Sequence, residues 1–344
     1  MQALRTVMLG LDDTGREWLE SLRNHPSFEL VGVADPDAAL AERIGDEARV
    51  PGYDDLRLVL VEQQADAALV CLRPSVAEPY FAIAAQTGTA TLCEPPAARG
   101  FEDLVRIAGD FYDADVPLVI ASRWRFDPVI GELLGGRSPV TAHLGHATVL
   151  ADLGPRPGWR GDAEHGGGVL RCAAYEAIDL LVHCFGLPGD VVAQMARSGP
   201  LASSAFDAED TVALLARCSG GSSFSLSAAW RTGGPLFDIT MLAGGARWRI
   251  VPEWVEVVPA DAAPYRRPRP DAAALRRAAL DRFSEATRAR GETYPGRVTD
   301  QLPTGAVIEA AYHAGRTLSP ESPLRAYERA GLPTPRMPSI ATVL

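Results

Sequence analysis

A glycine-rich turn near the start of the chain carries residues that could bind a dinucleotide. Gly10–Gly15 follows a strand-like run, Leu4–Leu9, and leads into a helical stretch, as a GxGxxG fingerprint does. Asp35 follows the next strand-like run, Glu29–Ala34, where an acidic residue accepts hydrogen bonds from the adenosine ribose. The pattern predicts a fold that favours NAD over NADP, with five cofactor-binding residues here: Gly10, Asp12, Thr14, Gly15 and Asp35.

One residue of this turn opposes cofactor binding. Asp12 stands in place of the middle glycine, which normally lets the backbone approach the pyrophosphate. A carboxylate aimed at the pyrophosphate would repel it by about 1 kcal/mol or more. A carboxylate turned to solvent would instead leave weak NAD binding intact, so both outcomes stay open.

A second group of polar side chains follows a helical period within Gly168–Phe185. In one continuous helix, four of them would lie within about 60° of one another, with a tyrosine beside them: Cys172, Glu176, Asp179 and His183, flanked by Tyr175. Such a stripe is either a solvated face or the wall of a site. In the second case Glu176 is the candidate general acid/base, with its pKa raised by burial, and Tyr175 is an auxiliary donor.

Arginines near the same segments could hold an anionic group. Arg160 and Arg171 flank three glycines, Gly166–Gly168, and Arg123 and Arg125 follow the strand-like run Pro117–Ala121. Guanidinium groups bind carboxylates and phosphates bidentately. A single arginine is more often surface charge, so only the group predicts a binding site, together with Cys172 and Asp179. No metal site is expected, because the cysteines show no metal-ligand spacing and Cys172, Glu176 and His183 have no matching short spacing.

The elements that must position these residues change in kind along the chain. Strand and helix signals alternate over residues 1–122, which predicts a parallel sheet with crossover helices. After Pro128, longer strand signals predict a large, mainly antiparallel sheet, at Val140–Val149, Val191–Arg197, Thr211–Cys218, Ser222–Ala229, Phe237–Leu242 and Trp248–Val258. We expect a loop over Asp261–Pro270, two helices over Ala272–Arg290 and Thr304–Thr317, and an extended proline-rich tail over 319–344. The second domain is expected over 123–318.

Four further segments resemble the Gfo/Idh/MocA oxidoreductases, a family of sugar and cyclitol dehydrogenases. They follow one another in the family's order, and the resemblance runs from about Leu4 to Arg316: Leu92–Pro96, Arg125–Pro128, Trp159-Arg160 with Gly166–Gly168, and Glu209–Thr211. The resemblance implies a Rossmann domain and an α+β substrate domain with a large open sheet. It also implies cofactor contacts at Pro74, Glu94 and Pro95, a substrate contact at Trp159, and a homodimer or tetramer formed through the open sheet.

The departures from the family concern its catalytic groups. The lysine that assists proton transfer in the family is Pro95 here, and the chain contains no lysine. A proline supplies neither an amine nor an N–H. The family's aspartate and histidine on the substrate helix correspond to Cys172 and Glu176.

Composition narrows the partners and the compartment. The net charge of −11 argues against nucleic acid and anionic membranes. Five scattered cysteines read as free thiols of a reducing compartment. There is no long apolar run and no signal-peptide pattern, so we expect a cytoplasmic protein.

Three functions remain open. The first is a divergent, NAD-linked oxidoreductase-like enzyme that acts on a small polar metabolite. This metabolite is sugar- or cyclitol-like and either neutral or anionic. The second is a catalytically silent member, serving as a ligand-binding protein or as the partner subunit of another enzyme. The third is a redox-neutral lyase, cyclase or isomerase.

Overall fold

The computed structural model describes residues 2–135, 142–152, 158–197, 207–230, 234–289, 294–333 and 335. These residues form two compact units. The first unit comprises 1–98, 103–126 and 270–300, and the second comprises 99–102, 127–269 and 301–344. Neither unit is continuous in sequence.

The first unit is built on a six-stranded parallel sheet in the order β3-β2-β1-β4-β5-β6. Its strands are β1 (Leu4–Leu9), β2 (Phe28–Ala34), β3 (Gly52–Tyr53), β4 (Ala67–Val70), β5 (Ala90–Cys93) and β6 (Leu118–Ile120). The strand order reverses at β1: β2 and β3 lie on one side of it, and β4, β5 and β6 lie on the other. The central strands β1 and β4 pair in parallel. In open α/β sheets ligands bind at the carboxyl ends of the strands at this reversal.

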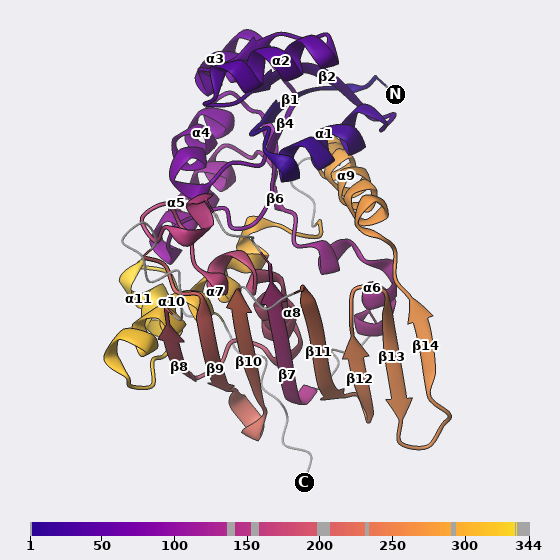
Figure 1. Cartoon of the computed structure of the whole chain (residues 1–344), viewed down its shortest axis with the longest axis vertical. Coiled ribbons are helices and arrows are strands. Elements are labelled where there is room, and N and C mark those ends of the chain that lie inside the picture. The colour runs from indigo at the N-terminus through magenta and orange to yellow at the C-terminus, as the bar shows by residue number, and fades with distance from the viewer. Residues whose placement is uncertain are drawn as a thin grey trace. The chain divides into compact units, whose positions relative to one another are not determined.

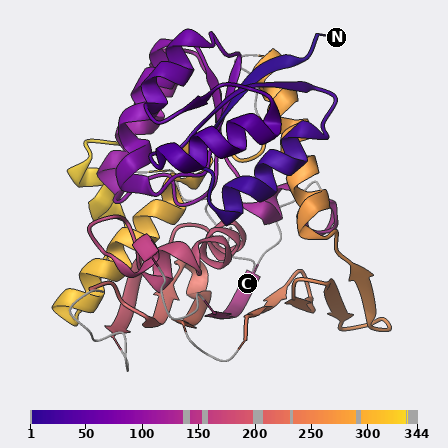
Figure 2. The same cartoon turned by 45° about the horizontal axis from the view of Figure 1, so that its top comes forward.

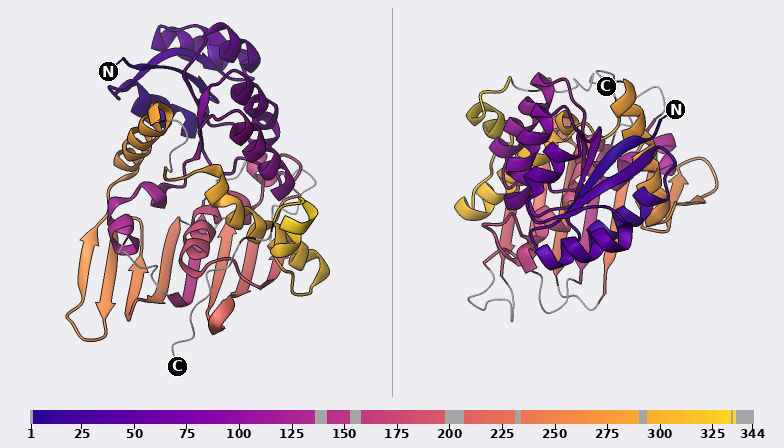
Figure 3. Two further views of the ribbon diagram at one scale, coloured as in Figure 1. Left: turned by 180° about the vertical axis from the view of Figure 1, so that it is seen from behind. Right: turned by 90° about the horizontal axis from the view of Figure 1, so that it is seen from above.

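Helices follow the strands and lie on either side of the sheet in the right-hand view of Figure 3. They are α1 (Asp13–Arg23), α2 (Ala38–Ala48), α3 (Leu56–Glu62), α4 (Pro74–Gln86) and α5 (Phe101–Asp113). Asp12, Asp37 and Asp55 accept hydrogen bonds from backbone amides at the starts of α1, α2 and α3.

The helix α9 (Ala272–Ala289) belongs to the first unit although it comes late in the chain. It packs beside α1 (Figure 2). Phe283 stacks on Phe28 with ring centroids 5.9 Å apart, and the Asp281 carboxylate lies 3.0 Å from His25 Nε2. Further on, the Gly296 carbonyl accepts a hydrogen bond from Ile120 N–H at 2.8 Å.

The second unit is built on an eight-stranded sheet in the order β14-β13-β12-β11-β7-β10-β9-β8 (Figure 1). Its strands are β7 (Ala142–Ala151), β8 (Asp190–Ala196), β9 (Thr211–Arg217), β10 (Ser223–Trp230), β11 (Leu236–Ala243), β12 (Ala246–Ile250), β13 (Trp254–Pro259) and β14 (Tyr265–Pro268). All neighbours pair antiparallel except β7 and β10, which are parallel. The predicted mainly antiparallel sheet is confirmed.

One face of this sheet is covered by helices, as the left view of Figure 3 shows. The covering helices are α8 (Tyr175–Phe185) and α10 (Leu302–Thr317). A Cβ at Gly145 of β7 would lie 2.8 Å from the Phe185 ring, so glycine allows α8 to approach the strand closely. No described helix lies over the opposite face (Figure 1), and large apolar side chains are exposed on its strands: Leu144, Val192, Leu215, Leu236 and Leu242.

Four expectations from the sequence are wrong in detail. Gly168–Phe185 is not one helix, because α7 (Val169–Cys172) ends before α8 begins. Trp248–Val258 is divided between β12 and β13 by a turn. The expected loop over Asp261–Pro270 contains β14, and the expected extended tail contains α11 (Leu324–Arg329).

The remaining described elements connect the strands. They are α6 (Pro128–Leu134) and the short 3-10 helices Arg123–Phe126, Gly158–Gly161, Ser219–Gly221 and Val298–Gln301. Val140 and Arg290, at the ends of two predicted elements, lie outside the described residues. Among the described residues, no helix is long and apolar enough to cross a membrane.

Candidate functional site

The glycines of the first turn are required by close backbone contacts. Gly10 has φ of 91°, and a Cβ there would lie 2.4 Å from the Cys71 carbonyl oxygen. A Cβ at Gly15 would lie 2.1 Å from the Gly10 carbonyl oxygen. The turn between β1 and α1 therefore needs glycine at both ends, as a dinucleotide-binding turn does.

Asp12 and Asp35 both direct their carboxylates at backbone amides of this turn. Asp12 is exposed, and its Oδ1 accepts a hydrogen bond from Gly15 N–H at 3.0 Å, which caps α1. Asp35 accepts from Leu11 N–H at 2.7 Å with Oδ2 and from Asp37 N–H at 2.9 Å with Oδ1. Asp12 thus places negative charge at the helix N-terminus, where the fingerprint places pyrophosphate. Thr14 is half-buried in the first turn of α1.

The segment after β5 is hydrogen-bonded to a side chain of α1. Trp18 is 2% exposed and donates a hydrogen bond from Nε1 to Glu94 Oε2 at 2.7 Å. Pro95 is half-buried, and the Pro95–Pro96 peptide is cis. Pro74, the first residue of α4, is buried.

Two of the predicted arginines belong to the first unit. Arg125 stacks over Trp124 at 4.7 Å and donates a hydrogen bond to the Asp300 carbonyl at 3.2 Å. Arg123, at the start of the same 3-10 helix, is exposed.

In the second unit, the predicted polar stripe is interrupted by the break between α7 and α8. Glu176 lies half-buried in the first turn of α8. Tyr175 is 5% exposed and donates to Gln301 Oε1 at 2.6 Å. Asp179 is fully buried and accepts from Thr304 Oγ1 of α10 at 2.8 Å. Tyr175 and Asp179 therefore contact the segment around the start of α10. Because Cys172 lies in α7 and Glu176 in α8, a single helical wheel does not predict the directions of their side chains.

A cluster around α7 brings two predicted residues together with two that were not predicted as site residues. Arg171 stacks over the Tyr312 ring at 4.7 Å. Tyr312 donates its hydroxyl to Glu209 Oε1 at 2.9 Å, and the same oxygen accepts from Leu170 N–H at 3.0 Å. The fourth member is Cys172, and the charges of Arg171 and Glu209 both act on the pKa of its thiol.

Burial controls the titration of this cluster. It raises the pKa of the Glu209 carboxyl, against the hydrogen bonds from Leu170 and Tyr312 and the Arg171 charge, which lower it. Burial also raises the pKa of the Cys172 thiol to about 12, although Arg160 and Arg171 oppose this shift. The sequence contained a signal for Glu209 in its Glu-Asp-Thr segment, whereas nothing in the sequence singled out Tyr312.

Trp159 and Arg160 pack against the glycines that precede α7. The Arg160 guanidinium stacks over Trp159 at 4.8 Å, and the Arg160 carbonyl accepts from Gly168 N–H at 2.8 Å. A Cβ at Gly167 would lie 2.4 Å from that carbonyl oxygen. The glycines therefore let the Arg160 backbone lie directly against the chain entering α7.

The cysteines of the first unit are unsuited to nucleophilic chemistry. Burial raises the pKa of Cys71 and Cys93, and the Glu94 charge raises both further. A nucleophilic cysteine needs a lowered pKa. Among the described residues, no three His, Cys, Asp or Glu side chains are grouped so as to hold a metal ion.

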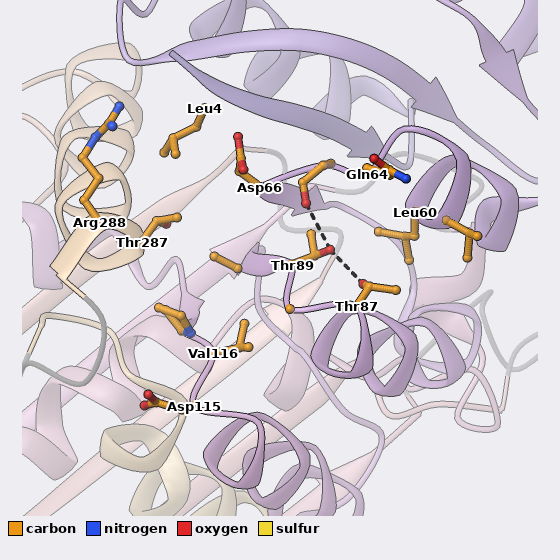
Figure 4. Close-up of a pocket in the computed structure, with 15 residues that line it drawn as sticks. Leu4, Leu60, Gln64, Asp66, Thr87, Thr89, Asp115, Val116, Thr287 and Arg288 are labelled. Carbon is orange, nitrogen blue, oxygen red and sulfur yellow. Dashed lines mark hydrogen bonds between the residues drawn. The ribbon is translucent and has the colours of Figure 1, made fainter. Parts of the chain in front are cut away.

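A hollow of about 530 Å³ opens at the amino ends of the first unit's strands (Figure 4). Asp66, Thr89 and Asp115 line it, and Arg288 of α9 lies at its side. Thr89 Oγ1 lies 2.8 Å from Thr87 Oγ1 and donates to the Ala65 carbonyl at 3.3 Å. The hollow lies at the end of the sheet opposite to Gly10 and Asp35, so it is separate from the dinucleotide turn.

The family follows from comparison with known sequences. Residues 4–118 match the family model of the Gfo/Idh/MocA oxidoreductases with an NAD-binding Rossmann fold, and residues 122–251 match that of the family's C-terminal domain. The chain belongs to the Gfo/Idh/MocA family. No curated protein matches this member.

Solved structures with the same fold cover nearly the whole chain. An oxidoreductase from Agrobacterium radiobacter, in complex with NAD+, L-tartaric acid and magnesium, has a TM-score of 0.79 at 14% identity and covers 94% of this chain and 99% of its own. A levoglucosan dehydrogenase with NADH and L-sorbose has a TM-score of 0.81 at 17% identity, with coverages of 94% and 99%. The WlbA dehydrogenase from Bordetella pertussis, with NADH and UDP-GlcNAcA, has a TM-score of 0.77 at 19% identity, with coverages of 93% and 99%. At these identities the likeness shows the shared fold.

Proposed function

We propose that this chain is a divergent, NAD-linked oxidoreductase of the Gfo/Idh/MocA family. Its substrate would be a small polar metabolite, sugar- or cyclitol-like and anionic, handled by residues other than the family's catalytic set. The observation that carries the proposal is the preserved Gly10–Gly15 turn. Its two glycines admit no side chain, and the Asp35 carboxylate is hydrogen-bonded to Leu11 within it.

The residues of the first unit fit NAD with one exception. Amides of the Gly10–Gly15 turn would hold the pyrophosphate and Asp35 the ribose, with Pro74, Glu94 and Pro95 near the nicotinamide, as the family resemblance implies. The exception is Asp12, whose carboxylate competes for Gly15 N–H. When bound, NAD supplies the hydride acceptor.

Glu176 is our candidate for the group that takes the proton from the substrate alcohol. It is half-buried at the start of α8, and it replaces the family's histidine. A carboxylate can serve as a general base within hydrogen-bond reach of the hydroxyl. Tyr175 is the weaker partner in this proposal, because its hydroxyl already donates to Gln301.

A silent family member is the second candidate. Pro95 cannot transfer a proton, and Asp12 occupies an amide that the cofactor needs. Such a protein would bind a ligand or serve as the partner subunit of an active enzyme. A redox-neutral lyase, cyclase or isomerase would also explain the loss of the lysine.

The test combines a cofactor titration with a turnover assay. We expect calorimetry to detect NAD binding to the full chain, and a panel of sugar acids, sugars and inositols to give NADH. Glu176→Gln should lower kcat by about 100-fold or more, because general acid/base catalysis contributes that much, and should leave the NAD affinity unchanged. The matched control is Glu164→Gln, at an exposed position before α7.

Two outcomes would redirect the proposal. No NAD binding at millimolar concentration would favour the silent protein. NADH production that is unchanged in Glu176→Gln would remove Glu176 as the catalyst.

A further inference from the structure

Two guanidinium groups beside α7 are stacked on aromatic rings and not paired with carboxylates. Arg160 lies over Trp159 and Arg171 over Tyr312. Other arginines of the second unit pair with acids: Arg217 with Asp190, and Arg269 with the buried Asp127. No ion pair joins Arg160 or Arg171 to a carboxylate of the residues that the structure describes. In a chain of net charge −11, two such cations on one short segment are conspicuous.

Tyr312 contacts both Arg171 and the acid Glu209. Its ring lies under the guanidinium, and its hydroxyl donates to Glu209 Oε1. Glu209 also accepts from Leu170 N–H, so its carboxylate is held by both the phenol and the start of α7. Arg171 itself donates from Nη1 to the Gly167 carbonyl at 3.3 Å, which fixes one end of the guanidinium. The remaining N–H groups of Arg171 have no acceptor among the described residues.

Glycine at position 168 makes this arrangement possible. Gly168 has φ of 115°, and a Cβ there would lie 2.4 Å and 2.5 Å from the two Glu209 carboxylate oxygens. It would also lie 2.6 Å from the Tyr312 hydroxyl oxygen. The acid and the phenol therefore pack directly against the backbone at Gly168, while Arg171 stacks on the Tyr312 ring.

The charged groups around Cys172 leave a net positive site. The charges of Arg160 and Arg171 lower the pKa of the Cys172 thiol, and the charge of Glu209 raises it. The thiol itself is neutral at ordinary pH, because burial raises its pKa to about 12. An incoming anion would therefore meet two cations, one hydrogen-bonded acid and an uncharged thiol.

We propose that Arg160 and Arg171 bind a carboxylate of the substrate beside Cys172, and that Tyr312 is a positioning residue that keeps Arg171 from pairing with Glu209. A guanidinium on an aromatic face is held flat, with its N–H edge available to a carboxylate. The inference rests on the proposed function only in treating the bound anion as the substrate. The anion site itself requires neither NAD nor turnover.

Cys172 allows the site to be tested without knowing the substrate. Iodoacetate and iodoacetamide alkylate thiols in the same way and are nearly isosteric, but only iodoacetate carries a carboxylate. The full chain is treated with each reagent at about pH 9, which increases the thiolate fraction. Mass spectrometry then gives the rate ratio of iodoacetate to iodoacetamide at each cysteine. Cys184 and Cys218 are internal controls, because acids and not arginines influence their pKa values.

We expect the ratio at Cys172 to exceed the ratios at Cys184 and Cys218 by about fivefold or more. A factor of five is about 1 kcal/mol, a modest attraction for two nearby cations. Arg171→Met, which keeps the apolar stem, should bring the ratio at Cys172 down to the level of the controls. Equal ratios at all three cysteines would overturn the proposal. So would the absence of any modification at Cys172 while the other two react, because a small anion could then not reach the site.

Three variants test the positioning role of Tyr312. Tyr312→Leu should lower the ratio as far as Arg171→Met does, because Arg171 can then pair with Glu209. Adding Glu209→Gln to Tyr312→Leu should restore the ratio, since glutamine keeps an acceptor for Leu170 N–H but has no charge. Tyr312→Phe keeps the ring and should retain most of the preference.

The double variant separates positioning from general damage. If Tyr312→Leu has no effect, or if Glu209→Gln fails to restore the ratio, the positioning role of Tyr312 is wrong. NAD is absent from all these measurements. A failed NAD titration therefore leaves this result standing, and a failure here leaves the proposed cofactor untouched.

Discussion

Asp12 stabilises a local structure and at the same time opposes the ligand expected there. Its carboxylate caps α1 through Gly15 N–H, so the side chain does not simply turn to solvent. A capping carboxylate at a helix N-terminus is favourable for the fold. The same N–H and the same positive end of the helix would otherwise bind pyrophosphate.

Replacing Asp12 should separate its charge from its capping role. We expect Asp12→Asn to bind NAD more tightly than the natural chain, by about fivefold or more, because asparagine caps nearly as well without the charge. Asp12→Gly should gain at least as much, at a loss of a few tenths of a kcal/mol in stability. Titration calorimetry and urea unfolding measure the two effects. Equal or weaker NAD affinity in both variants would show that Asp12 is not what limits binding.

Restoring the family's lysine alone should not restore the family's chemistry. Pro95→Lys adds an amine, but Cys172 and Glu176 still differ from the family's aspartate and histidine. We expect no NADH from sugars or inositols with Pro95→Lys. The comparison variant carries Pro95→Lys, Cys172→Asp and Glu176→His together. Activity of the single variant across the panel would contradict this expectation.

At the scale of residues, the sequence predicted which residues belong to the dinucleotide turn better than it predicted which side chains contact one another. The Gly10–Gly15 turn, Asp35 and the family membership followed from residue types in order along the chain. The contacts of Asp179 with Thr304 and of Tyr312 with Glu209 join residues more than 100 positions apart. No local pattern contains such information.

At the scale of elements, the α7–α8 break shows what hydrophobic period cannot reveal. The apolar residues of Gly168–Phe185 keep a helical period through the break, so the sequence predicts one helix. Near Ala174 the helical hydrogen bonding is irregular: its N–H reaches back to the Val169 carbonyl, and its ψ is −4°. The strand β14 was missed for another reason. It lies at the edge of the sheet, where prolines and arginines are tolerated, so its composition resembles that of a loop.

The cap of α7 by Glu209 should make stability depend on pH. Burial raises the pKa of Glu209 above its ordinary value of 4.5, so the folded state keeps this proton to higher pH than the unfolded state does. The resulting stability is fully present below pH 4.5 and is lost as pH rises through the folded-state pKa. Glu209→Gln lacks this contribution.

We therefore expect the natural chain to lose stability relative to Glu209→Gln as the pH rises above 4.5. Urea unfolding of both proteins between about pH 4 and pH 8 measures the difference. A constant difference over this range would show that Glu209 titrates alike in the folded and unfolded states.

At the scale of the whole molecule, one face of the eight-stranded sheet is not covered by any helix among the described residues. Leu215 of β9 is 47% exposed there, with Leu144 of β7 and Val192 of β8 also on this face. Exposed apolar patches of this kind commonly mark protein interfaces. We predict a homodimer or a larger homo-oligomer through this face, burying about 1,000 Å² or more.

Leu215→Arg should therefore produce monomers. Light scattering coupled to size exclusion at micromolar concentration measures the mass. The matched control is Leu58→Arg on α3, where the natural leucine is 45% exposed but lies in the first unit. A natural chain that is already monomeric would contradict the prediction, as would a Leu215→Arg variant that keeps the oligomer.

The late return of the chain to the first unit has a consequence for biosynthesis. Residues 1–98 and 103–126 emerge from the ribosome first, but α9, which packs on Phe28, follows only after residue 271. At translation rates of roughly 5–20 residues per second, the intervening segment takes on the order of ten seconds or more to synthesise. Until then the nascent first unit exposes the apolar surface around Phe28 that Phe283 will cover. A fragment that stops at residue 126 would keep that surface uncovered permanently.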